Sequence, residues 1–153
     1  MNAQSYCLNL LKRRLRSERE LREAMGRKEV EAAEQDSVIG VLKELGLVDD
    51  LRFARSWVHT RDRLAPRGAF VLRQELAQKG IAADLISQVL AERSEQARTQ
   101  DDQPTEEDLA RRLVEGRGRL YANLAPEVRE RRLMAMLQRR GFSYDVIRHI
   151  LDT

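Results

Sequence analysis

Residues 72–90, LRQELAQKGIAADLISQVL, and residues 133–151, LMAMLQRRGFSYDVIRHIL, are two copies of one pattern. Seven pairs match without a gap, each separated by 61 positions: Leu72 and Leu133, Leu76 and Leu137, Gly80 and Gly141, Ile81 and Phe142, Asp84 and Asp145, Ile86 and Ile147, Leu90 and Leu151. Leucines four residues apart share one side of an α-helix, and a glycine before an apolar residue is typical of a helix C-terminus, where glycine adopts a left-handed conformation. The pattern therefore predicts, twice, a helix, a glycine stop and a second helix with an acidic residue in its first turn.

A further helix is expected upstream of each copy. Residues 53–57 (FARSW) correspond to residues 109–113 (LARRL), with apolar side chains at the first, second and fifth positions. Residues 21–45 supply a looser copy of the repeat, in which Glu29 stands where the glycine would align. These repeats predict an all-α fold of three tandem three-helix modules. The expected modules are residues 1–48, 49–96 and 105–153, with an acidic linker at residues 97–104.

Capping signals and apolar spacing divide the chain into nine expected helices. Ser17 followed by Glu20 is typical of a capping box, and Pro126 suits the first turn of a helix. At helical spacing, Leu15 continues the apolar side of the first helix and Leu45 that of the third. The expected helices cover residues 2–14, 17–27, 35–45, 50–64, 67–79, 82–96, 105–122, 126–140 and 143–152.

The composition favours packed, charged helices over a disordered chain. Of the 153 residues, 42% are apolar and 35% are charged, which is more apolar than disordered sequences are. No apolar run approaches the roughly 18 residues of a membrane-spanning helix, and the first apolar stretch precedes its basic residues, the reverse of a secretory signal. We therefore expect a cytoplasmic monomer without a membrane segment.

Residues that could catalyse a reaction or hold a metal are few and scattered. Cys7 is the one cysteine, and His59 and His149 lie far apart in the sequence, so neither a disulfide nor a zinc site is expected. Asp49 and Asp50 are the most enzyme-like feature because adjacent carboxylates can hold Mg²⁺. The doublet directly precedes an expected helix, however, where an aspartate serves as an N-cap. The sequence predicts no enzyme activity, no metal and no cofactor.

Arginine supplies the strongest binding signal. The net charge is +3, but residues 109–153 alone hold ten basic and five acidic side chains. At about 100° per residue, Arg131, Arg132 and Arg139 face away from the apolar side of their helix, whereas Arg140 points toward it. Arginine forks suit carboxylates and phosphates, although a solvated helix face would explain any single cluster. The hypothesised contacts to an acidic protein surface or to DNA are Arg13, Arg14, Arg67, Arg131, Arg132 and Arg139.

Several segments, in this order and spacing, resemble the RecX family of bacterial regulatory proteins. They are residues 14–22 (RLRSERELR), residues 45–50 (LGLVDD), Phe53-Ala54 with Trp57-Val58, residues 66–68 (PRG), and residues 72–81, which end in Lys79-Gly80-Ile81. The likeness is dense over residues 1–92 and weaker through the last module, where Gly141-Phe142 repeats the Gly80-Ile81 pair.

The resemblance implies an elongated, curved array of three three-helix modules without an active site. It implies binding to the filament of the RecA recombinase on DNA and suppression of ATP hydrolysis, strand exchange and stimulation of repressor cleavage. Recombination, DNA repair and the SOS response would thereby be modulated, with at most weak, non-specific contact to DNA. The alternative that the residues leave open is a direct DNA binder of helix-turn-helix type, although base-reading side chains do not cluster at the start of one helix.

Overall fold

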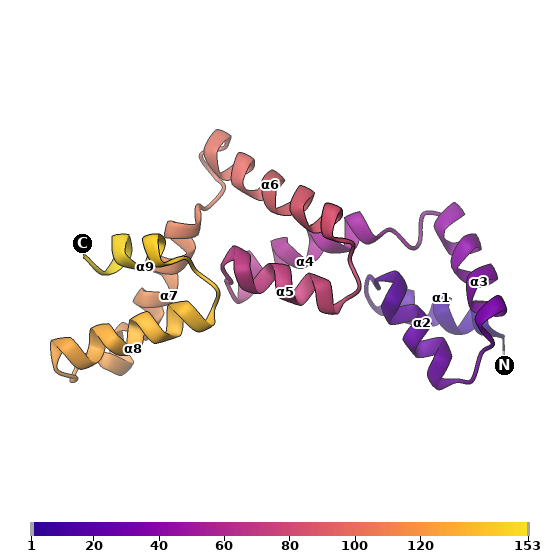
Figure 1. Ribbon diagram of the computed structural model, residues 1–153, viewed down its shortest axis with the longest axis horizontal. Helices are drawn as coiled ribbons and strands as arrows, with labels where there is room; N and C mark the ends of the chain where they lie inside the picture. Colours follow the sequence, from indigo (N-terminus) through magenta and orange to yellow (C-terminus); the bar gives the residue numbers. More distant parts are fainter. Residues whose placement is uncertain (1, 153) are drawn as a thin grey trace.

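The computed structural model describes residues 2–152, which fold into nine α-helices and no β-strand (Figure 1). The helices are α1 (Ala3–Arg13), α2 (Glu18–Arg27), α3 (Ala32–Glu44), α4 (Asp50–Leu64), α5 (Ala69–Gln78), α6 (Ala83–Thr99), α7 (Glu106–Tyr121), α8 (Pro126–Arg139) and α9 (Tyr144–Leu151). They follow one another as three groups of three along an elongated, curved molecule, with the two ends of the chain far apart (Figure 1). The all-α expectation is confirmed; residues 1 and 153 of the expected outer modules lie outside the described residues. Among residues 2–152, no helix is both long and apolar enough to cross a bilayer.

Local side-chain chemistry explains where the helices begin. Ser17 and Glu20 form the expected capping box at α2, in which the Ser17 hydroxyl accepts from the Glu20 N–H and the Glu20 carboxylate accepts from the Ser17 N–H. The Asp49 side chain accepts from the N–H of Arg52 at the start of α4. Such contacts satisfy backbone donors that have no partner within the helix.

Left-handed turns end the helices where the repeat predicted them. Gly80 and Gly141 have φ values of 80° and 89°, which confirms the expected glycine stops. Glu29 adopts the same kind of turn, with φ of 58°. The first module therefore makes the turn without a glycine, and its inner loop resembles those of the other two.

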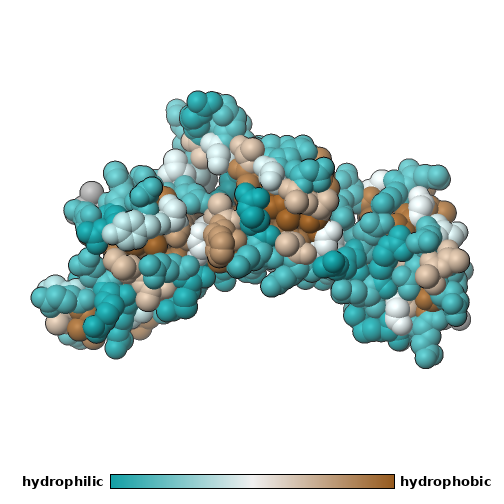
Figure 2. Space-filling view, in the orientation of Figure 1, coloured by the Kyte–Doolittle hydropathy of each residue, from teal (hydrophilic) through white to brown (hydrophobic). Residues whose placement is uncertain are grey.

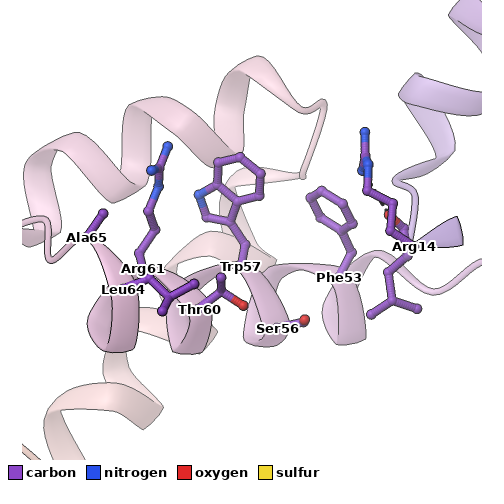
Figure 3. Close-up of a pocket in the computed structure, with 9 residues that line it drawn as sticks. Arg14, Phe53, Ser56, Trp57, Thr60, Arg61, Leu64 and Ala65 are labelled. Atoms are coloured by element: carbon purple, nitrogen blue, oxygen red, sulfur yellow. Dashed lines mark hydrogen bonds between the residues drawn. The ribbon is translucent and has the colours of Figure 1, made fainter.

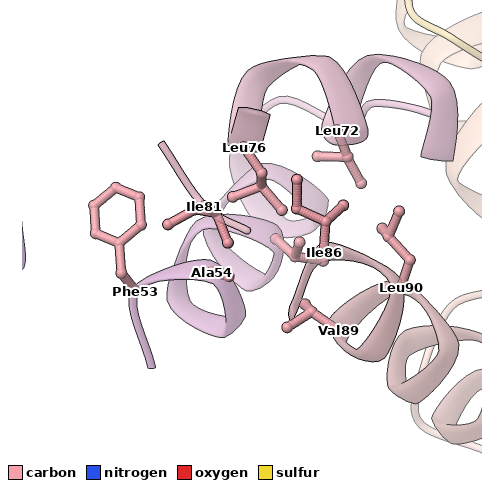
Figure 4. Close-up of a cluster of buried hydrophobic side chains, with 9 residues drawn as sticks. Phe53, Ala54, Leu72, Leu76, Ile81, Ile86, Val89 and Leu90 are labelled. Atoms are coloured by element: carbon pink, nitrogen blue, oxygen red, sulfur yellow. The ribbon is translucent and has the colours of Figure 1, made fainter. Parts of the chain in front are cut away.

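Each group of three helices encloses its own apolar core. In the second group, side chains from α4, α5 and α6 meet in one cluster (Figure 4). That cluster consists of Phe53, Ala54, Val58, Leu72, Leu76, Ile81, Ile86, Val89 and Leu90. The first core includes Leu21, Leu42 and the fully buried Cys7, and the third is built around Leu109, Leu137 and Ile147. Burying apolar area contributes about 25 cal/mol per Å² to folding, so each group has a hydrophobic driving force of its own.

Four sequence expectations need correction. α3 begins at Ala32, earlier than expected, and α6 continues to Thr99, so the first residues of the expected linker are helical. Leu15 lies beyond the end of α1 and packs against the second core. Leu45 is the C-cap residue of α3 and is 61% exposed. Helical spacing misplaced both leucines because each lies just past a helix end, where the period no longer applies.

Candidate functional site

Three arginines on α8 form the outer surface of the third module. Arg131, Arg132 and Arg139 are all exposed, whereas Leu133, Met136 and Leu137 of the same helix are buried. Across residues 2–152, none of the three arginines forms an ion pair with an acidic side chain. Arg132 lies 5.9 Å from the centre of the Tyr121 ring, a cation–π contact. The three guanidinium groups are available to an acidic partner, because none is held in an ion pair within the described residues.

The basic end of α1 lies in the first module on the side that meets the second module, because Leu15, just beyond it, packs against the second core. Arg13 is exposed in the last turn of α1. Arg14 is half exposed and donates to the Glu20 carboxylate through both terminal nitrogens, at 3.3 and 2.5 Å. The structure therefore separates the predicted contacts into two surfaces, because α1 and α8 belong to the outer modules (Figure 1).

Arg67 differs from the other predicted contacts because it is partly buried between the second and third modules. Its Nη1 donates to the carbonyls of Ala65 and Pro66, both at 3.1 Å. Burial lowers the pKa of the Arg67 guanidinium, and the nearby positive charges of Arg140 and Arg61 lower that pKa further. The Arg67 side chain thus contacts backbone carbonyls of its own loop, unlike the exposed arginines of α8.

The other polar residues considered as catalytic or metal-binding candidates are Asp50, His59 and His149, and they form no common site. Asp50 accepts a hydrogen bond of 3.0 Å from the N–H of Glu18, the first residue of α2, so it caps a helix of the neighbouring module. Burial raises the pKa of the Asp50 carboxyl. His59 is exposed, and His149 lies 3.5 Å from the Glu107 carboxylate. Within residues 2–152, no group of three or more His, Cys, Asp or Glu side chains is placed to hold a metal ion.

Both junctions between modules join the same two kinds of helix end through a hydrogen bond, which sequence reasoning missed. At the first junction, the fully buried Ser17 hydroxyl donates to the carbonyl of Lys79 at 2.7 Å. At the second, the N–H of Gly68 donates to the carbonyl of Arg140 at 2.7 Å. Ser17 and Gly68 are the N-caps of α2 and α5, and Lys79 and Arg140 are the C-caps of α5 and α8. The N-terminus of α2 thus meets the C-terminus of α5, and the N-terminus of α5 meets the C-terminus of α8. Each contact brings together opposite ends of two helix dipoles.

Arg93 reinforces the second junction. Its guanidinium donates to both carboxylate oxygens of Asp62, at 3.0 and 2.9 Å, and to the Glu106 carboxylate at 2.9 Å. The same Glu106 oxygen accepts from the N–H of Ala69 at 2.8 Å. The Arg93 side chain is only 11% exposed, so α4, α5, α6 and α7 are joined through one shielded cation. The placement of these acidic residues around Arg93 carries no periodic signal in the sequence.

Replacing Arg93 with methionine should destabilise this junction. Methionine keeps much of the side-chain volume but leaves Asp62 and Glu106 partly buried without their cation, so the loss should be about 2 to 3 kcal/mol. Urea denaturation followed by circular dichroism would measure the change.

Arg55→Met is the matched control, because Arg55 makes a similar two-point contact with Glu92 on the exposed surface. Solvent weakens such exposed pairs, so this variant should shift the unfolding midpoint far less. Equal losses in the two variants would contradict the assigned role of Arg93.

The face of the molecule seen in Figure 2 is mostly hydrophilic. Figure 2 shows polar residues over all three modules, interrupted by separate apolar areas rather than by one continuous apolar face. On this face, then, polar side chains and small apolar patches are presented together.

Comparisons with known proteins match every module to one family. Residues 3–42, 49–90 and 105–151 match the models of the first, second and third three-helix domains of RecX. The regulatory protein RecX of Amycolatopsis mediterranei is 32% identical, with 97% of this chain and 83% of that protein covered. RecX of Thermobifida fusca is 36% identical, with coverage of 98% and 79%.

Solved structures agree in fold. A crystal structure of a regulatory protein RecX superposes with a TM-score of 0.84 at 26% identity, covering 99% of this chain and 72% of that one. RecX from Lactobacillus salivarius gives a TM-score of 0.80 at 22% identity, which supports the fold. With three matched domains in order and relatives above 30% identity over nearly the whole chain, this protein belongs to the RecX family of regulatory proteins.

Proposed function

We propose that this chain regulates the RecA recombinase by binding its filament on DNA. Binding lowers ATP hydrolysis, strand exchange and the stimulation of repressor cleavage, and so modulates recombination, DNA repair and the SOS response. The protein acts in the cytoplasm as a monomeric binding protein rather than as an enzyme. Family membership supports the regulatory role. The binding surface is inferred from the exposed arginines of α8. Arg131, Arg132 and Arg139 have no ion-pair partner across residues 2–152.

The modular shape explains how such a protein can act on a filament. Exposed arginines belong to the first and third modules, which are the outer modules of the array (Figure 1). Hydrogen bonds at both junctions connect neighbouring modules. A filament offers identical protomers side by side, so one chain can contact more than one of them. Once the first contact has formed, the second is intramolecular, and the effective concentration is high.

Inhibition of DNA-dependent ATP hydrolysis tests this proposal. Adding the protein below the RecA concentration, on single-stranded DNA, should slow hydrolysis, because each bound chain affects neighbouring protomers. A coupled ATPase assay, with a pull-down of RecA in the presence and absence of the DNA, would give the rate and the binding. Unchanged hydrolysis at saturating protein would contradict filament regulation.

Direct contact with DNA is expected to be weak and non-specific. Neutralising phosphates with arginine releases counterions, so such binding falls steeply as salt rises. Fluorescence anisotropy of labelled DNA, in the absence of RecA, would measure it at several salt concentrations. Tight, sequence-selective binding that resists salt would instead favour the helix-turn-helix alternative.

A further inference from the structure

An apolar cleft of about 480 Å³ opens along α4 where the first and second modules meet (Figure 3). Its lining comes from residues just after α1 and from α4 with the residue that follows it: Arg14, Leu15, Phe53, Ser56, Trp57, Thr60, Arg61, Leu64 and Ala65. This volume is in the range of pockets that bind small molecules or a few side chains. None of the arginine contacts on α8 belongs to the cleft, so it is a separate surface.

Two rows of side chains on α4 form the cleft. Phe53, Trp57 and Arg61 follow one another at four-residue spacing and extend from the same side of the helix (Figure 3). Ser56 and Thr60, with Leu64 beyond them, form a parallel row. The Leu64 side chain is 69% exposed, which leaves a large apolar group beside the cleft without cover from the described chain.

Trp57 gives the cleft a fixed wall. Its ring stacks on Phe53 with centres 5.9 Å apart, and its Nε1 donates to the Glu75 carboxylate at 3.3 Å. The guanidinium of Arg61 lies 5.0 Å, and the amino group of Lys79 5.3 Å, from the centre of the Trp57 ring. A ring held by these contacts loses little entropy when a partner binds.

Positive charge surrounds the apolar surface. Arg14 lines one end of the cleft and Arg61 the other (Figure 3). Both are paired with carboxylates, Glu20 and Glu75. Lys79 adds a third cation beside the Trp57 ring, and its amino group lies 3.9 Å from the Glu20 carboxylate that Arg14 also contacts, so three cations stand against two carboxylates. The site therefore combines an apolar surface with an excess of cations, which complements apolar side chains flanked by acidic ones.

We propose that this cleft docks an acidic peptide segment of the filament protein, with an apolar side chain of that segment seated beside Trp57 and Leu64. The inference rests on the proposed function for the identity of the partner, and adds a second contact that is independent of α8. Carboxylates of the segment lie near the cations of Arg14, Arg61 and Lys79, while the apolar side chain covers Leu64.

The chemistry of the lining favours a peptide over single-stranded DNA. Bases bind by stacking on open aromatic faces, but the Trp57 ring is already in contact with Phe53, Arg61 and Lys79. An apolar side chain, unlike a base, does not need an open ring face.

Fluorescence of Trp57 tests the proposal directly, because it is the single tryptophan of the chain. The probe is a synthetic peptide in which Leu and Phe alternate with Asp and Glu, titrated into the full-length protein. We expect saturable changes in Trp57 emission. Peptides with Asn and Gln in place of the acids, or Ser in place of the apolar residues, should bind more weakly. Equal binding of the amide peptide would overturn the charge complementarity.

Leu64→Asp tests the site itself. It removes the uncovered apolar group and adds a repelling charge, so it should weaken peptide binding about tenfold, or about 1.4 kcal/mol. Leu120→Asp is the matched control, because Leu120 is 68% exposed on α7, outside the cleft. Its affinity for the peptide should be unchanged. Equal affinities for wild type and Leu64→Asp would overturn the site, as would displacement of the peptide by a single-stranded oligonucleotide.

The ATPase assay separates failure of this inference from failure of the proposed function. If wild type and Leu64→Asp slow RecA hydrolysis equally well and the peptide leaves Trp57 emission unchanged, the filament role stands and the cleft proposal is overturned. If wild type leaves hydrolysis unchanged, the filament role is wrong. A peptide that still binds at the Leu64-dependent site would then support the cleft chemistry but overturn RecA as the source of the segment.

Discussion

Gly68→Ala should detach the third module from the second and lower the free energy of unfolding by about 2 to 4 kcal/mol. A Cβ at position 68 would lie 2.1 Å from the carbonyl oxygen of Gly141 and 2.5 Å from the backbone nitrogen of Phe142. Backbone atoms cannot move aside as a flexible side chain can. The junction must therefore open, and the 2.7 Å hydrogen bond from Gly68 N–H to the Arg140 carbonyl is lost.

Two measurements check this expectation. Urea denaturation should show the loss of stability, and small-angle X-ray scattering should show a larger, more variable molecule while the helical circular dichroism changes little. Gly40→Ala is the matched control, because Gly40 lies inside α3 with nothing within 4 Å of an added Cβ. Alanine there should stabilise the protein by about 0.5 to 1 kcal/mol. A Gly68→Ala variant as stable as wild type would show that the modules are not held by this contact.

Replacing Arg131, Arg132 and Arg139 together with glutamate should weaken filament binding by a hundredfold or more, on the order of 3 kcal/mol or above. All three side chains are exposed and lack an ion pair within residues 2–152, so the folded protein loses no contact with a carboxylate. The helical spectrum and the melting temperature should stay close to those of wild type. Binding would be measured by surface plasmon resonance on immobilised RecA filaments, together with ATPase inhibition.

A second triple variant separates the position of the charges from their number. Arg27, Arg52 and Arg111 are also exposed and without ion pairs in the described chain. Changing them to glutamate takes the net charge from +3 to −3, as in the α8 variant. Filament binding should fall much less in this control. If both variants lose affinity equally, net charge rather than the α8 face governs binding.

Arg140 should contribute to stability rather than to filament binding, unlike Arg139, the preceding residue at the end of α8. Arg140 is half-buried and is the C-cap of α8, and its carbonyl accepts the junction hydrogen bond from Gly68. Lys79 holds the matching place at the end of α5 and contacts the Trp57 ring. The carbonyls of both residues accept the hydrogen bonds that join neighbouring modules.

The sequence by itself determined the all-α class, the three repeats, the glycine turns and the family. These features depend on helical periodicity, on capping and on matched spacing, which act within a few residues along the chain. The outward direction of Arg131, Arg132 and Arg139 was also predictable, because a helix fixes the direction of each side chain relative to its apolar face.

Only the tertiary structure decided how the modules join and where the cleft opens. Ser17 meets Lys79 across 62 positions, Leu15 packs on the second core, Asp50 caps α2, and Arg93 joins acidic groups from α4 and α7. None of these contacts has a period or a local motif, because each depends on the orientation of one module against the next. That orientation depends on close packing of neighbouring modules at Ser17 and Gly68. At the first junction the serine hydroxyl is fully buried, and at the second there is no room for a Cβ at position 68.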